Sequence, residues 1–430
     1  MRPNLLQPDF YIQNRARLNA QLLPKSVAVF HSNLQMPTNA DGTLPFVQNS
    51  DLFYLTGIDQ EDTTLLLFPD SPNPKFKQIL FIRYADEQVL TWEGHKLSKE
   101  QAKEISGIEI VLWHSEFDKF FRSLVFDAEK IYLNTNEHKR ADNSIKNRDE
   151  QFVTWSMDHF PLHNYHRLAP IMHKLRTEKQ EFEMRYLKTA CQITQSGFER
   201  IAQFLKPNVY EYELEAELIH EFIRKGSKGF AYQPIIASGP DSCVLHYTTN
   251  HKQCQDGEIV LLDIAAEYGN YKSDLTRVLP VNGRFSPRQK EVYQAVLNMF
   301  YFAKSLLLPG TDFEEYNKAV GQKAEEELVK LGLFSAEEAK NQDPARPLYR
   351  KYFMHGVSHF LGLDVHDVGA MTGKMSSGML LTCEPGIYIR DEGIGIRLEN
   401  DILITQNGHY DLMENIPIEI EEIEDLMVKR

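Results

Sequence analysis

Cysteine is scarce in this chain: four of its 430 residues are cysteines, at positions 191, 243, 254 and 383. Their spacing is irregular and includes no CxxC pair, which argues against a disulfide framework and against a structural zinc site. We therefore expect four ordinary reduced thiols.

Long hydrophobic runs are also missing, because no apolar segment approaches the roughly 20 residues that are needed to span a bilayer. The amino terminus, MRPNLLQPDFYIQNRARLNAQ, has neither a continuous apolar core nor a small-residue cleavage site, so it does not resemble a signal peptide. We expect no membrane association and, by default, a cytoplasmic location.

Positive charge is in deficit, with 47 Lys and Arg against 61 Asp and Glu and a formal net charge of -14. Such a surface would repel a phosphate backbone, and no basic stripe relieves the repulsion locally, so nucleic acid is excluded as a partner. A composition of 42% hydrophobic and 25% charged residues is typical of a soluble globular protein. The length exceeds one ordinary core, which predicts at least two domains.

The amino-terminal part, up to about residue 165, alternates short β-branched or aromatic runs with polar or helical stretches. This pattern predicts a mixed α/β domain. The strand candidates are SVAVFHS, TTLLLFP, QILFIR, VLWHS and KIYLN. The stretch HNYHRLAPIMHKLRTEKQ is interpreted as a bridge to a long helix, with Thr177 and Gln180 as the capping box at its start. We place the domain boundary between about 165 and 178 and assign domains 1–168 and 169–430.

The second domain contains an internal repeat of helices. A helix that opens at Ser286 ends in LLLPGTDFEEY, much as the first helix ends in FLKPNVYEYEL. Each is followed by another amphipathic segment that reaches a glycine, Gly226 or Gly332. The helical pattern therefore predicts a duplicated unit.

The repeat continues into strands that end in acidic residues. Asp263 ends the apolar run GEIVLLD and Glu384 ends GMLLTCE, each six residues after a glycine. A turn follows in each case, and the returning strand carries Asp274 in one half and Glu399 in the other. Two hairpins with two acids each predict a unit with a pseudo-twofold axis.

Four acids that converge on such an axis need compensating charge. A single acid at a strand end is usually a solvated surface group. Like charges about 5 Å apart, however, repel by roughly 3 kcal/mol per pair at an effective dielectric of about 20. Protons or cations must neutralise them, and two divalent ions balance four carboxylates without perturbing any pKa.

The segment HGVSHFLGLDVHD, residues 355–367, supplies imidazoles. His355 and His359 have helical spacing, but the neighbouring glycines and valines favour a loop or strand. Any one histidine alone is more often packed and satisfied by backbone, but three beside four acids favour a metal centre. Carboxylate-rich ligation with a single imidazole suits manganese and tolerates cobalt, zinc or iron. Two such metals hold a bridging water whose pKa falls toward about 7, which makes hydroxide available.

These residues resemble the Xaa-Pro aminopeptidases of the pita-bread metallopeptidases, a family that includes prolidases and methionine aminopeptidases. The matching motifs are LLDIAAEYGNYKSDLTR, HGVSHFLGLDVHD, TCEPGIYI and GIRLEND. The resemblance implies an α/β (α+β) chain, in which an accessory amino-terminal domain precedes a pseudo-twofold pita-bread catalytic domain. It also implies metal ligation by five residues, namely Asp263, Asp274 (bridging both metals), His359, Glu384 and Glu399.

Other residues receive substrate-directed or supporting roles from the same resemblance. His366 would hydrogen-bond the peptide near its scissile carbonyl, and His246 would stabilise the tetrahedral intermediate. Glu384 would also shuttle the water proton. Arg397, two residues before Glu399, is expected to pair with a ligand carboxylate. We interpret His355 as structural support.

The weaker likeness of the amino-terminal half is carried by QNSDLFYLTG, at residues 48–57. Many relatives have an arginine where this chain has Val47, so no role follows for that position. Trp92 is either a core or surface residue or, as in tetrameric relatives, part of a neighbouring subunit's site. A homodimer or homotetramer is therefore expected. The segment EIEEIEDLM is interpreted as one solvated helix face.

The predicted function is hydrolysis of the bond between an amino-terminal residue and a following proline by a metal-bridging hydroxide, with such peptides as partners. A prolidase restricted to dipeptides shares all five ligands and is the first alternative. A metal-free relative, either creatinase-like or a binding module, is the second. A methionine aminopeptidase is disfavoured because such enzymes commonly lack so large an amino-terminal domain.

Overall fold

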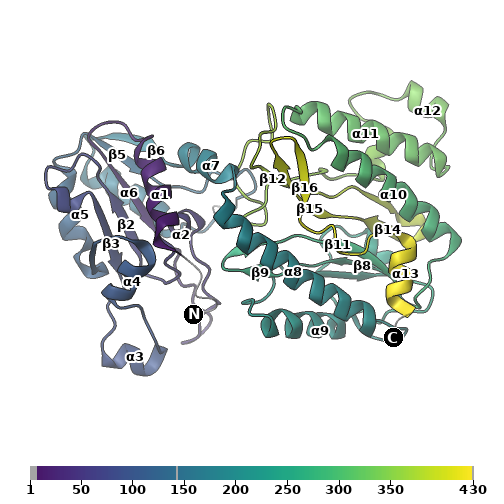
Figure 1. Ribbon diagram of the computed structural model, residues 1–430, viewed down its shortest axis with the longest axis horizontal. Coiled ribbons are helices and arrows are strands. Elements are labelled where there is room, and N and C mark those ends of the chain that lie inside the picture. Colours follow the sequence, from purple (N-terminus) through teal and green to yellow (C-terminus); the bar gives the residue numbers. More distant parts are fainter. Residues whose placement is uncertain (1–6, 142–143, 429–430) are drawn as a thin grey trace. The chain divides into compact units, whose positions relative to one another are not determined.

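The computed structural model describes residues 7–141 and 144–428, which form two compact units divided between Arg176 and Thr177 (Figure 1). We call them the amino-terminal and the carboxy-terminal unit. Helix α7 (Ala169–Thr177), which the 168/169 boundary assigns to the second domain, thus falls almost entirely in the amino-terminal unit.

A six-stranded mixed sheet with the order β4-β3-β2-β1-β5-β6 organises the amino-terminal unit. Within this sheet, β1 pairs antiparallel with β2 and parallel with β5. The strands are β1 (Ser26–His31), β2 (Thr64–Leu67), β3 (Gln78–Ile82), β4 (Ile110–Trp113), β5 (Lys130–Leu133) and β6 (Asn164–Arg167). The other helices are α1 (Pro8–Asn19), α2 (Ser50–Thr56), α3 (Glu87–Glu93), α4 (Lys99–Ser106), α5 (Phe117–Val125) and α6 (Arg148–His159). All five predicted strand runs form strands, and the mixed α/β prediction is confirmed.

The segment predicted to bridge the domains contains strand β6 and helix α7, and the predicted capping box of the long helix is wrong. Thr177 ends α7, and Gln180 is the N-cap of α8 (Glu181–Phe204), where its backbone N–H donates to Glu183 Oε2 at 2.9 Å. Between the two helices, Glu178 makes a β-bridge to Met379, which leaves Thr177 outside the new helix.

The carboxy-terminal unit consists of two halves that share a succession of two helices, a strand, a hairpin and a returning strand, to which each half adds elements of its own. The strands are β7 (Ile235–Ser238), β8 (Ile259–Asp263), β9 (Glu267–Tyr268), β10 (Tyr271–Lys272), β11 (Thr276–Pro280), β12 (Leu380–Cys383), β13 (Gly386–Ile389), β14 (Ile394–Arg397), β15 (Asn400–Thr405) and β16 (Gly408–Asp411). The helices, besides α8, are α9 (Glu211–Arg224), α10 (Pro287–Leu306), α11 (Phe313–Lys330), α12 (Ala336–Asn341) and α13 (Ile420–Val428). As predicted, Ser286 caps α10 in a capping box with Gln289.

The predicted repeat is confirmed in the two sheets of this unit. In the first half β8 leads through the β9–β10 hairpin to β11, which pairs antiparallel with β8. In the second half β12 leads through the β13–β14 hairpin to β15, which pairs antiparallel with β12. A β-bridge between Thr276 and Glu399 joins the halves. The acidic residues of both halves therefore meet where the two sheets approach each other.

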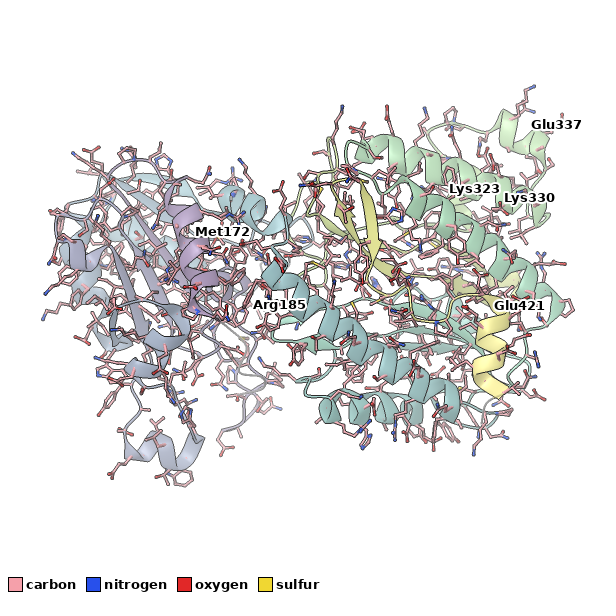
Figure 2. The ribbon with its side chains drawn as sticks, viewed as in Figure 1. Met172, Arg185, Lys323, Lys330, Glu337 and Glu421 are labelled. Carbon is pink, nitrogen blue, oxygen red and sulfur yellow. The ribbon has the colours of Figure 1, made fainter. Side chains whose placement is uncertain are left out.

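The carboxy-terminal acidic segment forms the predicted helix, α13, with one apolar and one charged face. Ile420, Ile423, Glu424 and Met427 are buried, whereas Glu421, labelled in Figure 2, is exposed. The isoleucines thus attach the helix to the core while its outer face carries charge. Among the described residues, no helix combines the length and the apolar character needed to cross a membrane.

Candidate metal centre

The five predicted metal-binding residues lie at strand ends and in one loop. Asp263 is the last residue of β8, and Glu384 follows β12 directly. Asp274 precedes β11, and Glu399 stands between β14 and β15. His359 lies outside the named elements, where its backbone N–H and C=O are bonded to Thr382 at the end of β12.

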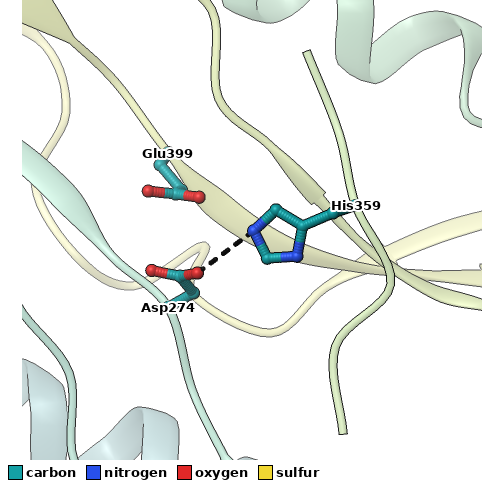
Figure 3. A group of neighbouring side chains, drawn as sticks. All are labelled: Asp274, His359 and Glu399. Carbon is teal, nitrogen blue, oxygen red and sulfur yellow. Dashed lines mark ion pairs between the residues drawn. The ribbon is translucent and has the colours of Figure 1, made fainter. Parts of the chain in front are cut away.

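Three of these residues form a compact group. Asp274, His359 and Glu399 each offer one ligand atom, and these atoms all lie within 4.8 Å of one another (Figure 3). The His359 Nε2 atom is 3.4 Å from Asp274 Oδ2 and 3.6 Å from Glu384 Oε1. Glu384 is therefore next to the group, on the imidazole side.

Asp263 joins the group through Tyr232. The hydroxyl of Tyr232 lies 2.5 Å from Asp263 Oδ1 and 2.6 Å from Asp274 Oδ1. Since one hydroxyl hydrogen serves only one carboxylate at a time, the two aspartates face each other with excess negative charge between them. The four acids and His359 thus form one cluster.

Without bound cations, the charges of these groups are poorly compensated. Burial, reinforced by the neighbouring acids, raises the pKa of Glu399 well above its usual range. Burial also raises the pKa of Asp263, and it raises that of Glu384 to about 7. Burial lowers the pKa of His359, but Asp274 and Glu384 outweigh that effect and raise it to about 9. Four hard oxygen donors and one imidazole in this state fit divalent cations, which would replace the protons.

Arg397, the last residue of β14, orients side chains of the centre through hydrogen bonds. This arginine is 4% exposed, and its guanidinium donates to Asp263 Oδ2 at 2.5 Å, to Thr276 Oγ1 at 3.1 Å and to the Tyr388 hydroxyl at 2.7 Å. Thr276 in turn donates to Glu399 Oε2 at 2.6 Å. One guanidinium therefore orients an acid from each half of the unit.

His355 lies at the edge of the centre, with its Nδ1 atom 3.7 Å from Glu384 Oε2. Its Nδ1 is 2.7 Å from the Gly356 carbonyl and its Nε2 is 2.8 Å from the Tyr388 hydroxyl. Burial, together with the charge of Arg397, lowers its pKa to about 3. The neutral tautomer that these partners select donates from Nδ1 and accepts from Tyr388 at Nε2.

The two remaining histidines occupy different surroundings. The His366 ring is half-buried and stands edge-on to the His359 ring, with centroids 4.4 Å apart and an interplanar angle of 89°. His246 lies in an exposed turn. Of the two, His366 is therefore the one that packs against a predicted metal-binding residue.

Sequence reasoning missed three hydroxyl side chains of the centre: Tyr232, Thr276 and Tyr388. Thr276 follows Asp274 by two residues on the returning strand, a spacing that places both on one face and could have identified it. Tyr232 precedes β7 and is 31 residues from Asp263, with no motif around it. Its contact depends on how β7 packs beside β8.

Comparison with known proteins identifies the family. Residues 185–406 match the model for metallopeptidase family M24, and residues 11–132 match the amino-terminal domain of aminopeptidase P. The Xaa-Pro aminopeptidase of Escherichia coli K12 is 34% identical over 429 residues, which is 97% of each chain.

Solved structures agree over the whole length. The aminopeptidase PepP of Pseudomonas aeruginosa superposes with a TM-score of 0.90 at 30% identity, covering 99% of each chain. Zinc-substituted aminopeptidase P of E. coli, in complex with product, superposes with a TM-score of 0.88 at 33% identity and the same coverage. The predicted fold, an accessory α/β domain followed by a pita-bread domain, is thereby confirmed, and the chain belongs to the M24 metallopeptidase family.

Proposed function

We propose that this protein removes the amino-terminal residue from peptides with proline at the second position. The observation that carries the proposal is the single buried centre of four carboxylates and one imidazole, in a chain similar over its whole length to Xaa-Pro aminopeptidases. The protein is a metallo-exopeptidase of the hydrolase class.

The residues that would hold two divalent ions are Asp263, Asp274, His359, Glu384 and Glu399. Manganese suits this donor set best, and cobalt, zinc or iron(II) would also bind. The zinc-substituted relative supports the view that such centres accept more than one metal. The bound ions would supply hydroxide at neutral pH and stabilise negative charge that develops on the scissile carbonyl.

The protein's own groups would move protons and orient the peptide. Glu384 lies at the edge of the acid group, 3.6 Å from His359 Nε2, where its carboxylate would take up and return a proton of the attacking water. His366, beside His359, and His246, in its exposed turn, would donate hydrogen bonds to the peptide carbonyl. Arg397 would keep Asp263 ionised and oriented.

The free amine of the peptide would lie against the acids. The acids would accept hydrogen bonds from this amine, and its anchoring would place the first peptide bond, and no later one, at the centre.

A prolidase is not favoured, since the whole-chain relatives are Xaa-Pro aminopeptidases. The test is to compare kcat/KM for an Xaa-Pro-Xaa tripeptide, its amino-acetylated form and an Xaa-Pro dipeptide at equal manganese. We expect the tripeptide to be cut before proline at least as efficiently as the dipeptide, and the acetylated peptide to resist. A strong preference for the dipeptide would assign the protein to the prolidases, and cleavage of the acetylated peptide would contradict the role of the free amine.

Assembly and location stay predictions. Trp92 is 82% exposed on α3, which rules out a core position and leaves it accessible to a second subunit. We propose a homodimer or homotetramer, which sedimentation analysis would establish. Cell fractionation would test the proposed cytoplasmic location.

A further inference from the structure

Next to His366 lies a buried ion pair that the proposed chemistry does not use. The Lys179 Nζ atom is 2.9 Å from Asp367 Oδ2, and both side chains are 1% exposed. Asp367 directly follows His366 in the chain. A fully desolvated charge pair at this place calls for an explanation, because apolar side chains of similar volume fill such space at no electrostatic cost.

The backbone holds both members of the pair in fixed positions. The Lys179 N–H donates to the Gly378 carbonyl at 2.7 Å, beside the bridge from Glu178 to Met379, so the lysine is attached to the chain that enters β12. The Asp367 N–H donates to the Phe360 carbonyl at 2.9 Å, which closes the loop that follows His359. The ion pair therefore links the His366 loop to the strand that ends at Glu384.

The loop also leaves room for the pair. A β-carbon at Gly362 would lie 2.1 Å from Asp367 Oδ2 and 2.9 Å from Lys179 Nζ. The Gly362 carbonyl meanwhile accepts from the Lys272 N–H at 2.8 Å, which fixes the loop to β10 as well. Glycine at this position thus permits the carboxylate and the ammonium to meet beneath the loop.

We propose that Lys179 and Asp367 are positioning residues for His366. The hydrogen bond from Lys179 Nζ to Asp367 Oδ2 is directional where apolar packing is not, so it holds the backbone of Asp367, and with it the His366 ring edge-on to His359. The inference rests on the proposed contact of His366 with substrate. Loss of the pair displaces His366 without removing any of the five metal-binding residues.

The test is a double-mutant cycle in the full-length, manganese-loaded protein. The variants are Lys179→Met, Asp367→Asn, His366→Ala and the combination of Lys179→Met with His366→Ala, assayed on an Xaa-Pro-Xaa tripeptide. Lys290→Met is the matched control, because Lys290 pairs at 3.0 Å with the buried Glu424, between α10 and α13. Metal content is measured for each protein.

We expect Lys179→Met and Asp367→Asn each to lower kcat by about tenfold or more, with KM changed less than about threefold and both metals retained. The combined variant should match His366→Ala within about twofold, because a residue that acts through His366 has no effect once the imidazole is absent. Lys290→Met should keep wild-type kcat. If Lys179→Met does not fold, Asp367→Asn, which retains an acceptor for the ammonium, replaces it in the cycle.

Three results would overturn the inference: an unchanged kcat, losses that multiply in the combined variant, or metal loss from the single variants. If His366→Ala itself kept full kcat, the proposed role of His366 would be wrong, and that failure is distinct from a failure of the ion pair alone. Gly362→Ala provides an independent check, since its β-carbon should reproduce the kcat loss by pushing the pair apart.

Discussion

The hydroxyl of Thr276 donates to Glu399 Oε2 at 2.6 Å, across the junction between the two halves of the carboxy-terminal unit. The Thr276 hydroxyl oxygen in turn accepts from Arg397 Nε at 3.1 Å. Thr276, the first residue of β11 in the first half, thereby orients Glu399, a proposed metal ligand of the second half. Its contribution should be visible in metal affinity.

Thr276→Val removes this hydroxyl at nearly constant volume. We expect manganese affinity to fall about tenfold or more, because Glu399 and Arg397 both lose an orienting partner. Isothermal titration of the chelator-treated protein measures the affinity. Thr405→Val, at the far end of β15, is the control and should bind manganese normally; equal affinity of the two variants would contradict the proposed role of Thr276.

Glu384→Gln and Asp274→Asn should each abolish hydrolysis while leaving the fold intact. Each change removes a proposed metal ligand, but the two sheets and their helices supply most of the buried apolar area. Hydrolysis of an Xaa-Pro-Xaa peptide and circular dichroism measure the two effects. Glu414→Gln, at an exposed position, should be fully active. More than a few per cent of activity in either ligand variant at saturating manganese would argue against the assignment.

Metal binding should become tighter as the pH rises. Without metal, the pKa of His359 is about 9 and that of Glu384 about 7, so protons occupy these groups at neutral pH and must leave before a cation binds. We expect affinity to increase from about pH 6 to about pH 8, with about one or more protons released per chain. Titration calorimetry in buffers of different ionisation enthalpy counts these protons. An affinity independent of pH would show that the centre is already deprotonated.

The amino-terminal unit should lose stability in acid through His114. Burial, followed by the charge of Arg148, lowers its pKa from 6.5 to about 4, and Arg148 Nη2 lies 3.3 Å from the ring Nε2. The unfolded chain therefore binds the proton more readily than the folded chain, so the stabilisation is complete above about pH 6.5 and is lost as the pH falls toward about 4. Because the group is partly exposed, we expect an effect of about 2 kcal/mol.

Tryptophan fluorescence reports this loss specifically, because all three tryptophans of the chain, at positions 92, 113 and 155, lie in the amino-terminal unit. The midpoint of urea unfolding should fall between about pH 7 and about pH 5 in the wild type. The fall should be smaller in His114→Gln, which keeps an acceptor but does not titrate in this range. Equal slopes for the two proteins would exclude His114 as the cause.

The sequence predicted those strands whose own residues have a strong preference for β-structure. The five strand runs are rich in β-branched and aromatic residues, and they form β1 to β5. Strand β6, with the sequence NYHR, is a half-exposed edge strand and gave no such signal. The capping-box pattern fitted both Thr177 with Gln180 and Gln180 with Glu183, and tertiary pairing of Glu178 with Met379 decided for the second.

In the candidate metal centre too, the sequence predicted only the residues that belong to a local pattern. The repeated spacing of an acid after a glycine pointed to Asp263 and Glu384, because duplication repeats a local pattern. Tyr232 and the pair of Lys179 with Asp367 carried no such signal. Lys179 and Asp367 are 188 residues apart in sequence, and only the packing of the loop after His359 against the start of α8 brings them into contact.

The most direct test of the account is a titration of chelator-treated protein with manganese, in which bound ions per chain and the rate of cleavage of an Xaa-Pro-Xaa peptide are measured together. The account predicts no hydrolysis without metal and full activity as the site fills with about two ions per chain. Full activity in metal-free protein, or manganese binding that leaves the peptide uncut before proline, would contradict it.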